Sequence, residues 1–420
     1  MSHLAFIESN TTGTGRIAVE RLLGRGDRVT FLTRSREKYP FLASPSPHLQ
    51  VVDAETNDSA AVTTVVAGLA RDVPVDAVLT FSDFYVAIVA EVAARLGFPY
   101  LSPSAARACR NKHLTRQALR AAGLPTPEFH RVASAEEARG LAVTLGFPLV
   151  VKPPADSSSY GVRVVRDVAE LEEHVRALAA EETNVRGQRL DGTVLVESYL
   201  EGPEYSVETV TLRDGSTTVI GVTDKHLSPS PHFVEMGHDF PSSSPPKIVR
   251  ALGDAVLRAL AAVGFDFGPA HTELRWTAQG PVVVEINPRL AGGMIPELVH
   301  YATGIDLLDS LIDLLAGRVP MLSSSRSEAA AIRFLTADRR GRLAGLRGAE
   351  QARQLPSVRE IHLEKRAGTM VQPAENAYHR LGFVIAAGAD AERVRSDVEE
   401  AIRLLHVEVE TDREMMQENR

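Results

Sequence analysis

The sequence predicts an α/β protein made of several domains, and three features of the chain lead to this fold class. Strand and helix patterns alternate along the first hundred residues. Longer strands joined by short turns follow from Thr193 onward. The chain has 420 residues, which is enough for two or three packed domains. We therefore expect a parallel sheet near the N-terminus and a different, larger unit in the second half.

Short apolar runs bounded by turn residues indicate four strands in the first hundred residues. These runs are Leu4–Glu8, Arg28–Thr33, Leu49–Asp53 and Asp76–Phe81. Apolar residues between them recur at helical spacing, most clearly at Phe84–Leu96. Because strand–helix alternation is typical of crossover connections, we expect these strands to be parallel, with helices covering the sheet.

The middle of the chain shows a mixed pattern. Pro125 and Pro127 mark a break in the chain. Asp214-Gly215 sits between two apolar runs and is a strong hairpin signal. The elements predicted here are a helix at Ala135–Leu145 and strands at Phe147–Lys152, Thr193–Ser198, Tyr205–Leu212 and Thr217–Asp224.

The segment Leu227–Pro246 is rich in serine and proline and has little periodicity. A loop of this length inside a compact domain is usually a lid or a disordered link. A helix at Lys247–Val263 and strands at His271–Trp276 and Pro281–Ile286 follow, and then a smaller α+β unit with a frayed tail. The expected domains are residues 1–110, 111–198, 199–325 with a lid at 227–246, and 326–420.

Composition restricts the class of protein. The formal net charge is −8 without a dense Lys/Arg stripe, which argues against a nucleic-acid partner. Cys109 is the only cysteine, so an internal disulfide and a cysteine metal cage are excluded, and a reducing cytoplasm is the expected compartment. The segment Met1–Asn10 resembles a buried strand more than a signal peptide. No apolar run approaches the roughly 20 residues needed to cross a bilayer, so we expect no membrane partner.

A glycine-rich turn follows the first strand and opens a helix. The segment Gly13–Ala18 fits the G-x-G-x-x-A pattern of dinucleotide-binding turns, and the N–H groups of a helix N-terminus attract anions. The pattern also requires an acidic residue about 20 positions later. The second strand ends instead at Thr33 and Arg34, which would suit at most a 2′-phosphate. We interpret the turn as a tight connection that could touch a substrate carboxylate, with an NADP-dependent oxidoreductase as the alternative.

Three side chains with oxygen ligands give the strongest chemical signal. Glu285 and Asn287 are two residues apart on a predicted strand and share one face of it. Glu273 lies on the preceding strand, which can pair with this one. Mg²⁺ prefers oxygen and is usually held by one or two carboxylates together with substrate phosphates. We predict that these three residues hold magnesium, because an unpaired glutamate on the apolar strand Val282–Ile286 would be costly to bury.

Arg289 comes two residues after Asn287 and lies on the same face if the strand continues. A guanidinium there can hold a transferring phosphoryl group in bidentate fashion; the alternative is a surface salt bridge. Three small residues follow, Ala291, Gly292 and Gly293. They leave room for the side chain of an activated substrate, which would be bulkier than alanine. The glycines also suit an unusual backbone turn, and both interpretations stay open.

Lysines and serines ahead of these carboxylates are candidates for binding phosphate. Lys152 ends a buried strand and precedes a run of small hydroxyl residues, and Lys112 starts a helix earlier in the chain. Hydroxyls and loop N–H groups are common phosphate donors. Each lysine alone would more often lie on the surface, but their order favours phosphate binding. The candidates are Lys112, Lys152, Ser158 and Ser159.

A further candidate segment, Glu197–Leu200 with Glu204, joins two predicted strands. Backbone groups at such a junction can hydrogen-bond an adenine edge, and a carboxylate can accept from two ribose hydroxyls. An ordinary polar bend is the alternative, and this segment alone does not decide between them.

In this order the residues resemble the ATP-grasp superfamily over about residues 100–315. The resemblance covers its two lysines (Lys112, Lys152), its adenine and ribose segment (Glu197, Leu200, Glu204) and its metal and phosphoryl-transfer residues (Glu273, Glu285, Asn287, Arg289). Lys225 is similar to a further lysine near the phosphates. The resemblance implies ATP and Mg²⁺ as cofactors. It also implies an N-terminal parallel-sheet domain, a small α+β nucleotide lobe, a larger metal-bearing lobe and a C-terminal α+β extension. The loop PPADSSSYGV departs from the family, since it carries only Gly161 where several glycines are usual.

Within the superfamily the chain resembles the L-amino-acid ligases, through the segments FIESNTTGTG, TFSDFY, PHFVEMGH and ENAYHRLGFVIAAG. This implies an acyl phosphate intermediate, attack by an amine, and release of ADP and phosphate. It also implies that Glu235 and His238 contact amino-acid substrates, and Asp83 is a second candidate for facing a substrate ammonium. Zinc binding by His232, Glu235 and His238 is an alternative, but the spacing differs from H-E-x-x-H.

The sequence therefore predicts an ATP-dependent carboxylate–amine ligase that forms a dipeptide or amide from small molecules, in specialised metabolism. Another ATP-grasp ligase, of the carboxylase or purine type, is the first alternative. A degenerate ATP-binding regulator is disfavoured, because every phosphate and metal position is filled. Assembly as a homodimer is left open.

Overall fold

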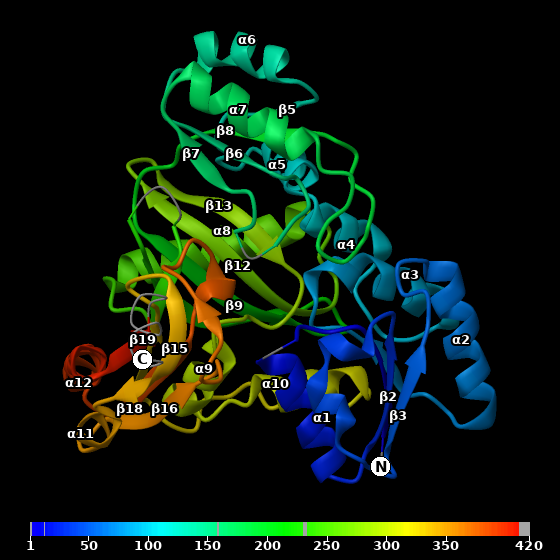
Figure 1. Cartoon of the computed structure of the whole chain (residues 1–420). Coiled ribbons are helices and arrows are strands. Elements are labelled where there is room, and N and C mark those ends of the chain that lie inside the picture. Colours follow the sequence, from blue (N-terminus) through cyan, green and yellow to red (C-terminus); the bar gives the residue numbers. More distant parts are fainter. Residues whose placement is uncertain (1, 12, 158, 230–232, 411–420) are drawn as a thin grey trace, which may run out of the picture.

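The computed structural model describes residues 2–11, 13–157, 159–229 and 233–410. Within these ranges the strands form one sheet of eight strands, two of four and one of three. Figure 1 shows a small lobe at the top, the N-terminal unit at the lower right, and the large sheet running from the centre into the C-terminal strands at the lower left.

The N-terminal unit is a parallel sheet in the order β3-β2-β1-β4. Its strands are β1 (His3–Ile7), β2 (Arg28–Thr33), β3 (Leu49–Asp53) and β4 (Ala77–Leu79), and its helices are α1 (Thr14–Gly24), α2 (Ser59–Asp72) and α3 (Val86–Leu96). All five residues of β1 are buried, as expected for a central parallel strand covered on both faces. The predicted parallel strands are confirmed, with α-helices after β1, β3 and β4; β2 and β3 are joined instead by two short 3₁₀ helices, Arg36–Lys38 and Pro40–Ala43.

The small lobe is an antiparallel sheet in the order β5-β8-β6-β7. Helices α4 (Pro103–Arg110) and α5 (Lys112–Ala121) lead into it, and its own elements are β5 (Phe129–Val132), α6 (Ala135–Leu145), β6 (Leu149–Lys152), β7 (Arg163–Val165), α7 (Val168–Ala179) and β8 (Val194–Ser198). Leu149, Leu171 and Val194 belong to a core that includes only residues of this lobe.

The eight-stranded sheet has the order β13-β12-β9-β10-β11-β14-β18-β16. Its strands are β9 (Glu204–Thr211), β10 (Thr217–Leu227), β11 (Glu235–Phe240), β12 (Gly268–Thr277), β13 (Gly280–Asn287), β14 (Ala329–Leu335), β16 (Val358–Leu363) and β18 (Gly382–Gly388). The hairpin predicted at Asp214-Gly215 joins β9 and β10, which pair antiparallel. Helix α8 (Pro246–Ala262) packs on this sheet through a core that includes Leu252 and Val256.

The loop predicted at Leu227–Pro246 is wrong for its second half. Strand β11 lies inside this segment and pairs with β10 on one side and β14 on the other. The sequence did not predict this strand, because its buried residues include the polar residues His238 and Asp239. Asp239 is buried at no large cost, since its carboxylate binds Arg333 at 2.7 Å and His226 at 2.9 Å.

The separate C-terminal unit expected after residue 325 is also only partly correct. Strands β14, β18 and β16 extend the large sheet, because buried runs such as Ala329–Leu335 pair along β18. The remaining elements are a three-stranded sheet of β15 (Gly341–Arg347), β17 (Met370–Val371) and β19 (His406–Glu410), with helices α11 (Ala349–Arg353) and α12 (Ala391–Leu404). The tail predicted to fray, residues 411–420, lies outside the described residues.

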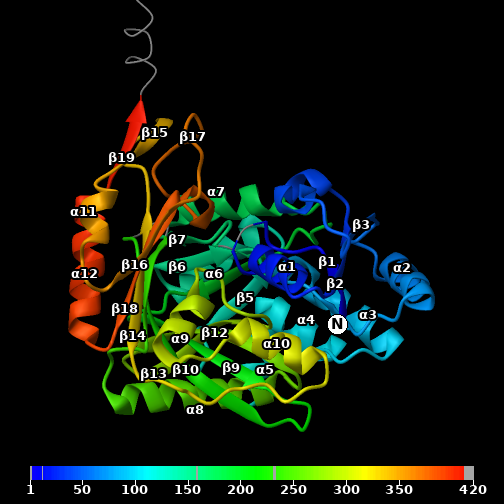
Figure 2. The same ribbon diagram turned by 90° about the horizontal axis from the view of Figure 1, so that it is seen from below.

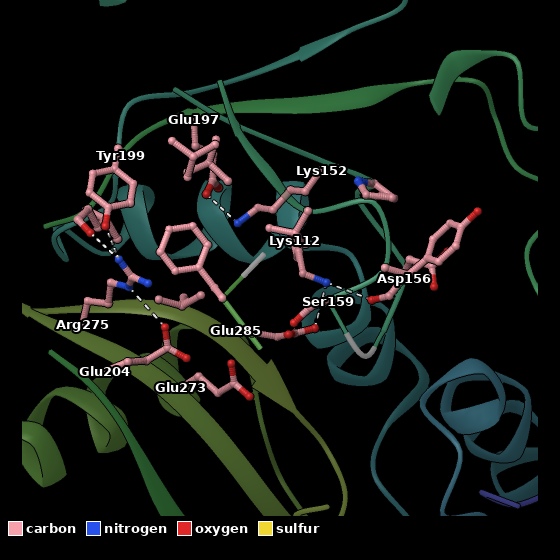
Figure 3. Close-up of a pocket in the computed structure, with 18 of the residues that line it drawn as sticks. Lys112, Lys152, Asp156, Ser159, Glu197, Tyr199, Glu204, Glu273, Arg275 and Glu285 are labelled. Carbon is pink, nitrogen blue, oxygen red and sulfur yellow. Dashed lines mark hydrogen bonds and ion pairs between the residues drawn. The ribbon is translucent and has the colours of Figure 1, made fainter. Parts of the chain in front are cut away.

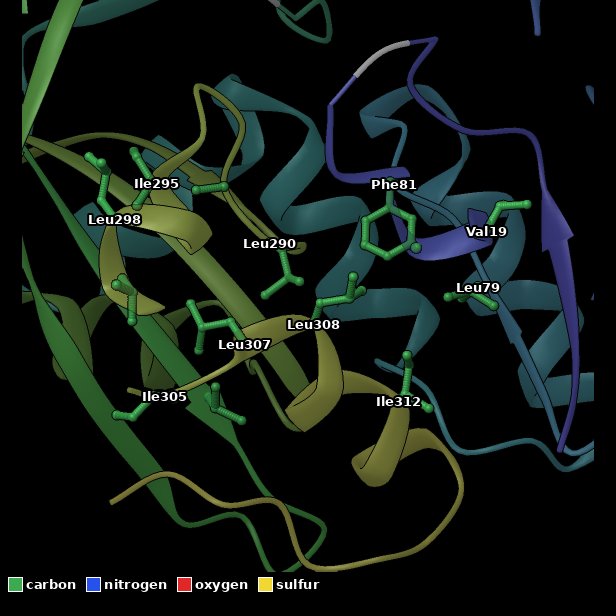
Figure 4. Packing of buried hydrophobic residues seen from close by; sticks show 14 of the residues in the cluster. Val19, Leu79, Phe81, Leu290, Ile295, Leu298, Ile305, Leu307, Leu308 and Ile312 are labelled. Atoms are coloured by element: carbon green, nitrogen blue, oxygen red, sulfur yellow. The ribbon is translucent and has the colours of Figure 1, made fainter. Parts of the chain in front are cut away.

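Helices α9 (Ile295–Thr303) and α10 (Leu307–Leu315) connect the N-terminal unit to the large sheet. Figure 2 shows them between the blue N-terminal helices and the orange C-terminal strands. One hydrophobic core joins these parts, with Phe81 and Leu79 from the N-terminal unit packed among Leu290, Leu308 and Ile312 (Figure 4). No helix among the described residues has the length and apolar character needed to cross a membrane.

Candidate active site

Three adjoining cavities lie where the small lobe, the N-terminal unit and the large sheet meet. We call them the lobe cleft, the central cavity and the outer cavity. The lobe cleft contains the predicted residues Lys112, Lys152, Ser159, Glu197, Leu200 and Glu204. The central cavity contains Lys225, Glu235, His238, Asn287 and Arg289, and shares Glu204, Glu273 and Glu285 with the lobe cleft. The outer cavity contains Asp83, and shares Arg289 and Gly293 with the central cavity.

All predicted site residues that the structure describes therefore line one continuous set of cavities. Ser158 and His232 lie outside the described residues. The alternative of zinc binding by His232, Glu235 and His238 is disfavoured further, because the Glu235 carboxylate pairs with Lys225 and Arg380 at 2.9 Å each. Among the described residues, no group of three or more His, Cys, Asp or Glu side chains is arranged to hold a metal ion.

Lys112 reaches the lobe cleft from the first position of α5. The side chain of Asn111 caps this helix by accepting hydrogen bonds from two backbone N–H groups. The Lys112 ammonium donates to the backbone oxygen of Asp156 at 2.9 Å and pairs with Glu285 at 2.8 Å. Figure 3 shows it between these two partners, with Ser159 close by. The ammonium therefore lies between the serine-rich loop and a predicted metal ligand.

Lys152 lies at the end of β6 and points into the same cleft (Figure 3). Its ammonium pairs with Glu197 at 2.6 Å, and Glu197 also binds Arg116 through both carboxylate oxygens, at 2.7 and 3.3 Å. Burial would raise the pKa of Glu197, but the charges of Arg116 and Lys152 outweigh it and lower the pKa to about 2. Glu197 is therefore ionised and aligns the lysine.

The junction between β8 and β9 forms the other wall of the cleft. Arg275 donates to the backbone oxygen of Leu200 at 2.8 Å and to Glu204 at 3.1 Å. Its guanidinium also lies over the rings of Tyr199 and Phe233, at 5.4 and 5.3 Å. Aromatic and backbone groups thus surround the position predicted for a base, with a carboxylate beside it.

The predicted metal ligands face one another across the β12–β13 pair. Glu273 lies opposite Glu285, and Asn287 lies opposite His271. Side chains on paired strands are close enough to act together. Two carboxylates and an amide oxygen suit Mg²⁺, and both carboxylates line the lobe cleft where phosphates would approach. The residues present therefore fit a magnesium ion held partly by the nucleotide.

Lys225 is the centre of a carboxylate cluster in the central cavity. Its ammonium binds Glu204 at 2.8 Å, Glu235 at 2.9 Å and Glu273 at 3.0 Å. Burial would lower the pKa of Lys225, but Glu204 and the other two carboxylates raise it well above its usual range. Each of these carboxylates also contacts a second cation: Glu204 binds Arg275, Glu235 binds Arg380, and Glu273 binds His271.

His271 is a second cation beside the metal ligands. Its ring nitrogens lie 2.8 Å from Glu208 and 3.1 Å from Glu273. Burial would lower the pKa of His271, but Glu208 and then Glu273 raise it to about 10. The imidazolium therefore orients Glu273, as residues that hydrogen-bond to metal ligands often do.

Arg289 lies where the central and outer cavities meet, although strand β13 ends at Asn287. Its guanidinium binds Asp83 at 2.7 and 2.6 Å, and Asp83 also accepts from the Ser157 hydroxyl at 2.6 Å. Burial would raise the pKa of Asp83, but Arg289 and Arg110 lower it below its usual range. Because both Asp83 oxygens are engaged, its role here is to fix Arg289; a substrate ammonium would have to share them.

His238 is fully buried beside Gly293. Neither of its ring nitrogens has a hydrogen-bond partner among the described residues, and burial lowers its pKa to about 3 despite the nearby Glu235. Gly293 has a φ of +59°, and a Cβ on it would lie 2.7 Å from the His238 Nε2 atom. Gly293 thus lines the site, but its own position is constrained by backbone shape and by His238. A Cβ on Gly292 would meet nothing within 4 Å.

The charged residues of the site that sequence reasoning missed include Arg116, His271 and Arg275. Arg116 lies four residues after Lys112, one helical turn along the same face. His271 lies two residues before Glu273 on the same strand face. These spacings could have found both, whereas the position of Arg275 over the β8–β9 junction depends on how the strands pair.

Comparisons with known proteins identify the family of the three parts of the chain. Residues 145–297 match an ATP-grasp domain, residues 23–100 match an ATP-grasp N-terminal domain, and residues 333–410 match the L-amino acid ligase C-terminal domain 2. The crystal structure of an L-amino acid ligase from Bacillus licheniformis superimposes with a TM-score of 0.82 and 25% identity, over 98% of this chain and 99% of that one.

Two relatives in sequence are informative. An uncharacterized protein of Sinorhizobium fredii is 32% identical over 94% of this chain and 80% of its own length. Alanine–anticapsin ligase of Bacillus amyloliquefaciens is 27% identical over 57% of this chain and 54% of its own length. A biotin carboxylase from Campylobacter jejuni shares the fold, with a TM-score of 0.71 at 17% identity.

Proposed function

This chain belongs to the ATP-grasp superfamily of carboxylate–amine ligases and carries the C-terminal domain of the L-amino acid ligases. We propose, from that family membership, that the protein converts an amino acid to an acyl phosphate and joins it to an amine. ATP-grasp enzymes use ATP with Mg²⁺. The product of the proposed reaction is a dipeptide or an amide, with ADP and phosphate released.

One observation carries the proposal: Arg289, fixed by Asp83, lies where the cavity with the predicted metal ligands meets the adjoining outer cavity. A carboxylate bound there would have the nucleotide on one side and space for a second substrate on the other. Such a position brings both reacting groups together, which can supply a large part of the rate enhancement.

In the first proposed step, an oxygen of the substrate carboxylate attacks the γ-phosphorus of ATP, the bond to the β-γ bridging oxygen breaks, and ADP leaves. In the second step, a neutral amine attacks the acyl carbon. The C–O bond to phosphate then breaks, and the amine proton leaves with the phosphate. Lys112 and Lys152 face the phosphates, and Arg289 stabilises the negative charge on the transferring group.

Glu273, Glu285 and Asn287 would hold the magnesium ion, whose chemistry is to offset phosphate charge during transfer. Lys225 and His271 keep Glu273 ionised and oriented. Burial would raise the pKa of Glu273, but Lys225 and His271 lower it to about 2. Glu273 is therefore charged throughout the physiological pH range.

The match to the L-amino acid ligase C-terminal domain favours this function over the carboxylase or purine-type alternative. Structures of that second type resemble this one at 15% to 19% identity, which supports the fold alone. The dinucleotide alternative is disfavoured, because most of the N-terminal unit matches an ATP-grasp N-terminal domain.

A screen for nucleotide products tests the proposal. The protein would be incubated with ATP, Mg²⁺ and pairs of amino acids, followed by measurement of ADP, phosphate, AMP and pyrophosphate and by mass spectrometry of the products. We expect ADP and phosphate to appear in equal amounts with a condensed product. AMP with pyrophosphate as the main products would contradict the acyl phosphate, and bicarbonate-dependent ADP release would favour the carboxylase alternative.

A further inference from the structure

We propose that Arg186 binds a carboxylate group on the amine substrate, so that the second substrate is an amino acid or another amine that carries an acid group. This inference rests on the proposed function and makes its second substrate more specific. It assigns recognition to a residue of the small lobe, the part of the molecule that also bears Lys152.

Arg186 lies on the connection between α7 and β8 and reaches across to the N-terminal unit. Its guanidinium donates to the Tyr39 hydroxyl and to the backbone oxygen of Ser9, at 3.0 Å each. The Tyr39 hydroxyl in turn donates to Glu8 at 2.5 Å. Arg186 lines the outer cavity and neither of the other two, so it lies away from the predicted phosphates.

The charges around the outer cavity single out this arginine. Three arginines line the cavity, and two are already paired: Arg289 binds Asp83 at 2.6 Å, and Arg380 binds Glu235 at 2.9 Å. Arg186 has only neutral acceptors, and no carboxylate of the described residues lies within ion-pair distance of it. A guanidinium that is held in place and still has free N–H donors is suited to a carboxylate, which it can bind in bidentate fashion.

A second lining residue fits the same kind of ligand. Glu364 lies on the part of the cavity wall formed by C-terminal residues and forms no ion pair with a described residue. The cavity therefore offers a half-buried cation, Arg186, and an exposed carboxylate, Glu364, neither of which is paired with a described residue of opposite charge. Amino acids are zwitterions that match both, whereas a simple amine leaves Arg186 without a partner. The activated carboxylate must lie near Arg289, so a second anion site belongs to the other substrate.

Arg186 also has a structural role, which the test must distinguish from recognition of the substrate. Its backbone oxygen accepts from Asn57 at 3.0 Å and from Arg34 at 3.3 Å, and Gln188 donates to the backbone oxygen of Phe84 at 2.9 Å. These contacts hold the segment between α7 and β8 against the N-terminal unit. Arg34 does not line the outer cavity, which makes Arg34→Met a matched control for loss of docking.

The experiment compares an amino acid with its own amide as the second substrate. The acid to be activated is first chosen by trapping with hydroxylamine, a small neutral nucleophile that converts an acyl phosphate to a hydroxamate. The parent, Arg186→Met, Arg186→Lys and Arg34→Met are then assayed for kcat/KM with the amino acid that the parent couples best, with its amide, and with hydroxylamine.

We expect Arg186→Met to lower kcat/KM for the amino acid by about 10²-fold relative to its amide, in line with the loss of a partly buried charged pair. Arg186→Lys should lose less, and Arg34→Met should leave the ratio of acid to amide unchanged. An equal loss for acid and amide in Arg186→Met, or a parent that couples the amide as well as the acid, would overturn the inference.

The assay with hydroxylamine distinguishes failure of the inference about Arg186 from failure of the proposed function. Hydroxamate formed by the parent with normal ADP release supports activation as an acyl phosphate, whatever Arg186 does. Absence of hydroxamate with all of the common amino acids would contradict the proposed function itself.

Discussion

Several carboxylates of the site are fixed by a cation on each side. Glu273 lies between Lys225 and His271, and Glu197 lies between Lys152 and Arg116. A buried carboxylate without such partners would lose its charge or destabilise the fold. The same pairing places an ionised oxygen where a metal ion or a ribose hydroxyl is expected. At the scale of single residues, stability and function therefore use the same contacts.

Glu285→Gln tests the predicted metal set. The amide keeps the shape of the side chain but removes the charge that pairs with Lys112 at 2.8 Å and that would bind Mg²⁺. We expect turnover, measured as ADP release at saturating Mg²⁺, to fall at least about 10²-fold. The control is Glu128→Gln, at an exposed carboxylate paired with Arg120 on the surface. Turnover of Glu285→Gln within threefold of the parent would remove the metal assignment.

Gly292 is a better test of substrate size than Gly293. A side chain on Gly293 would be strained by its φ of +59° and would collide with His238, so Gly293→Trp would change more than volume. Gly292 has space for a Cβ and lines the central and outer cavities. We expect Gly292→Leu to reduce kcat/KM for a large amino acid at least tenfold more than for alanine, because a filled pocket discriminates by volume.

The measurement is kcat/KM of both proteins for alanine and for an aromatic amino acid as the activated substrate. An equal loss for the two would mean that Gly292 serves the backbone, and the size prediction would be withdrawn.

At the scale of elements, helix α9 carries a half-buried acid. Glu297 lies in the first turn of α9, and its Oε2 atom is buried without a hydrogen-bond partner among the described residues. Burial raises the pKa of Glu297 to about 7 from its usual 4.5. Between these two values folding takes up a proton, so the contribution of Glu297 to stability is complete below about pH 4.5 and is lost as the pH rises through 7.

Glu297→Gln should therefore stabilise the protein at high pH. We expect the variant to exceed the parent by about 1–3 kcal/mol at pH 8, and the difference to vanish near pH 4.5. Thermal unfolding of both proteins between pH 5 and pH 8 measures this. A difference in Tm that does not change with pH would show that the carboxyl does not titrate with folding.

How far the sequence predicted each element depended on the regularity of its apolar pattern. Strands such as Arg28–Thr33 and helix Ala135–Leu145 were predicted with the bounds that the structure gives. Strand β11 was missed because it buries His238 and Asp239, whose partners come from distant segments. Glu285 and Asn287 could be named because they lie two residues apart on one strand, whereas Glu235 was named from the family resemblance. The cationic partners of the carboxylates could not all be named, since Arg275 and Arg380 reach the site only through tertiary packing.

At the scale of the whole molecule, the small lobe has a hydrophobic core of its own, whereas the N-terminal unit and the large sheet have a core in common. Leu171, Val175 and Val196 pack in a core made only of residues from the small lobe. A second core joins the N-terminal unit to α9, α10 and the large sheet. Polar contacts join the small lobe to the rest, such as Arg116 of α5 with Glu197 of β8 at 2.7 Å and Arg186 with the backbone oxygen of Ser9 at 3.0 Å. We therefore expect the small lobe to unfold locally at a lower free energy than the rest.

Two leucine substitutions test this difference. Leu171 and Leu308 are 0% and 3% exposed, so truncation to alanine removes a similar apolar volume from each core, at a typical cost of about 2–5 kcal/mol. We expect Leu171→Ala to speed amide hydrogen exchange across residues 129–198 and to leave the rest of the chain protected. Leu308→Ala should instead lower protection in the N-terminal unit and the large sheet together, because both share its core. ATP with Mg²⁺ should restore protection in the Leu171→Ala lobe, since a ligand that bridges the cleft binds only the folded lobe. Faster exchange throughout the chain in Leu171→Ala would show that the molecule unfolds as one unit.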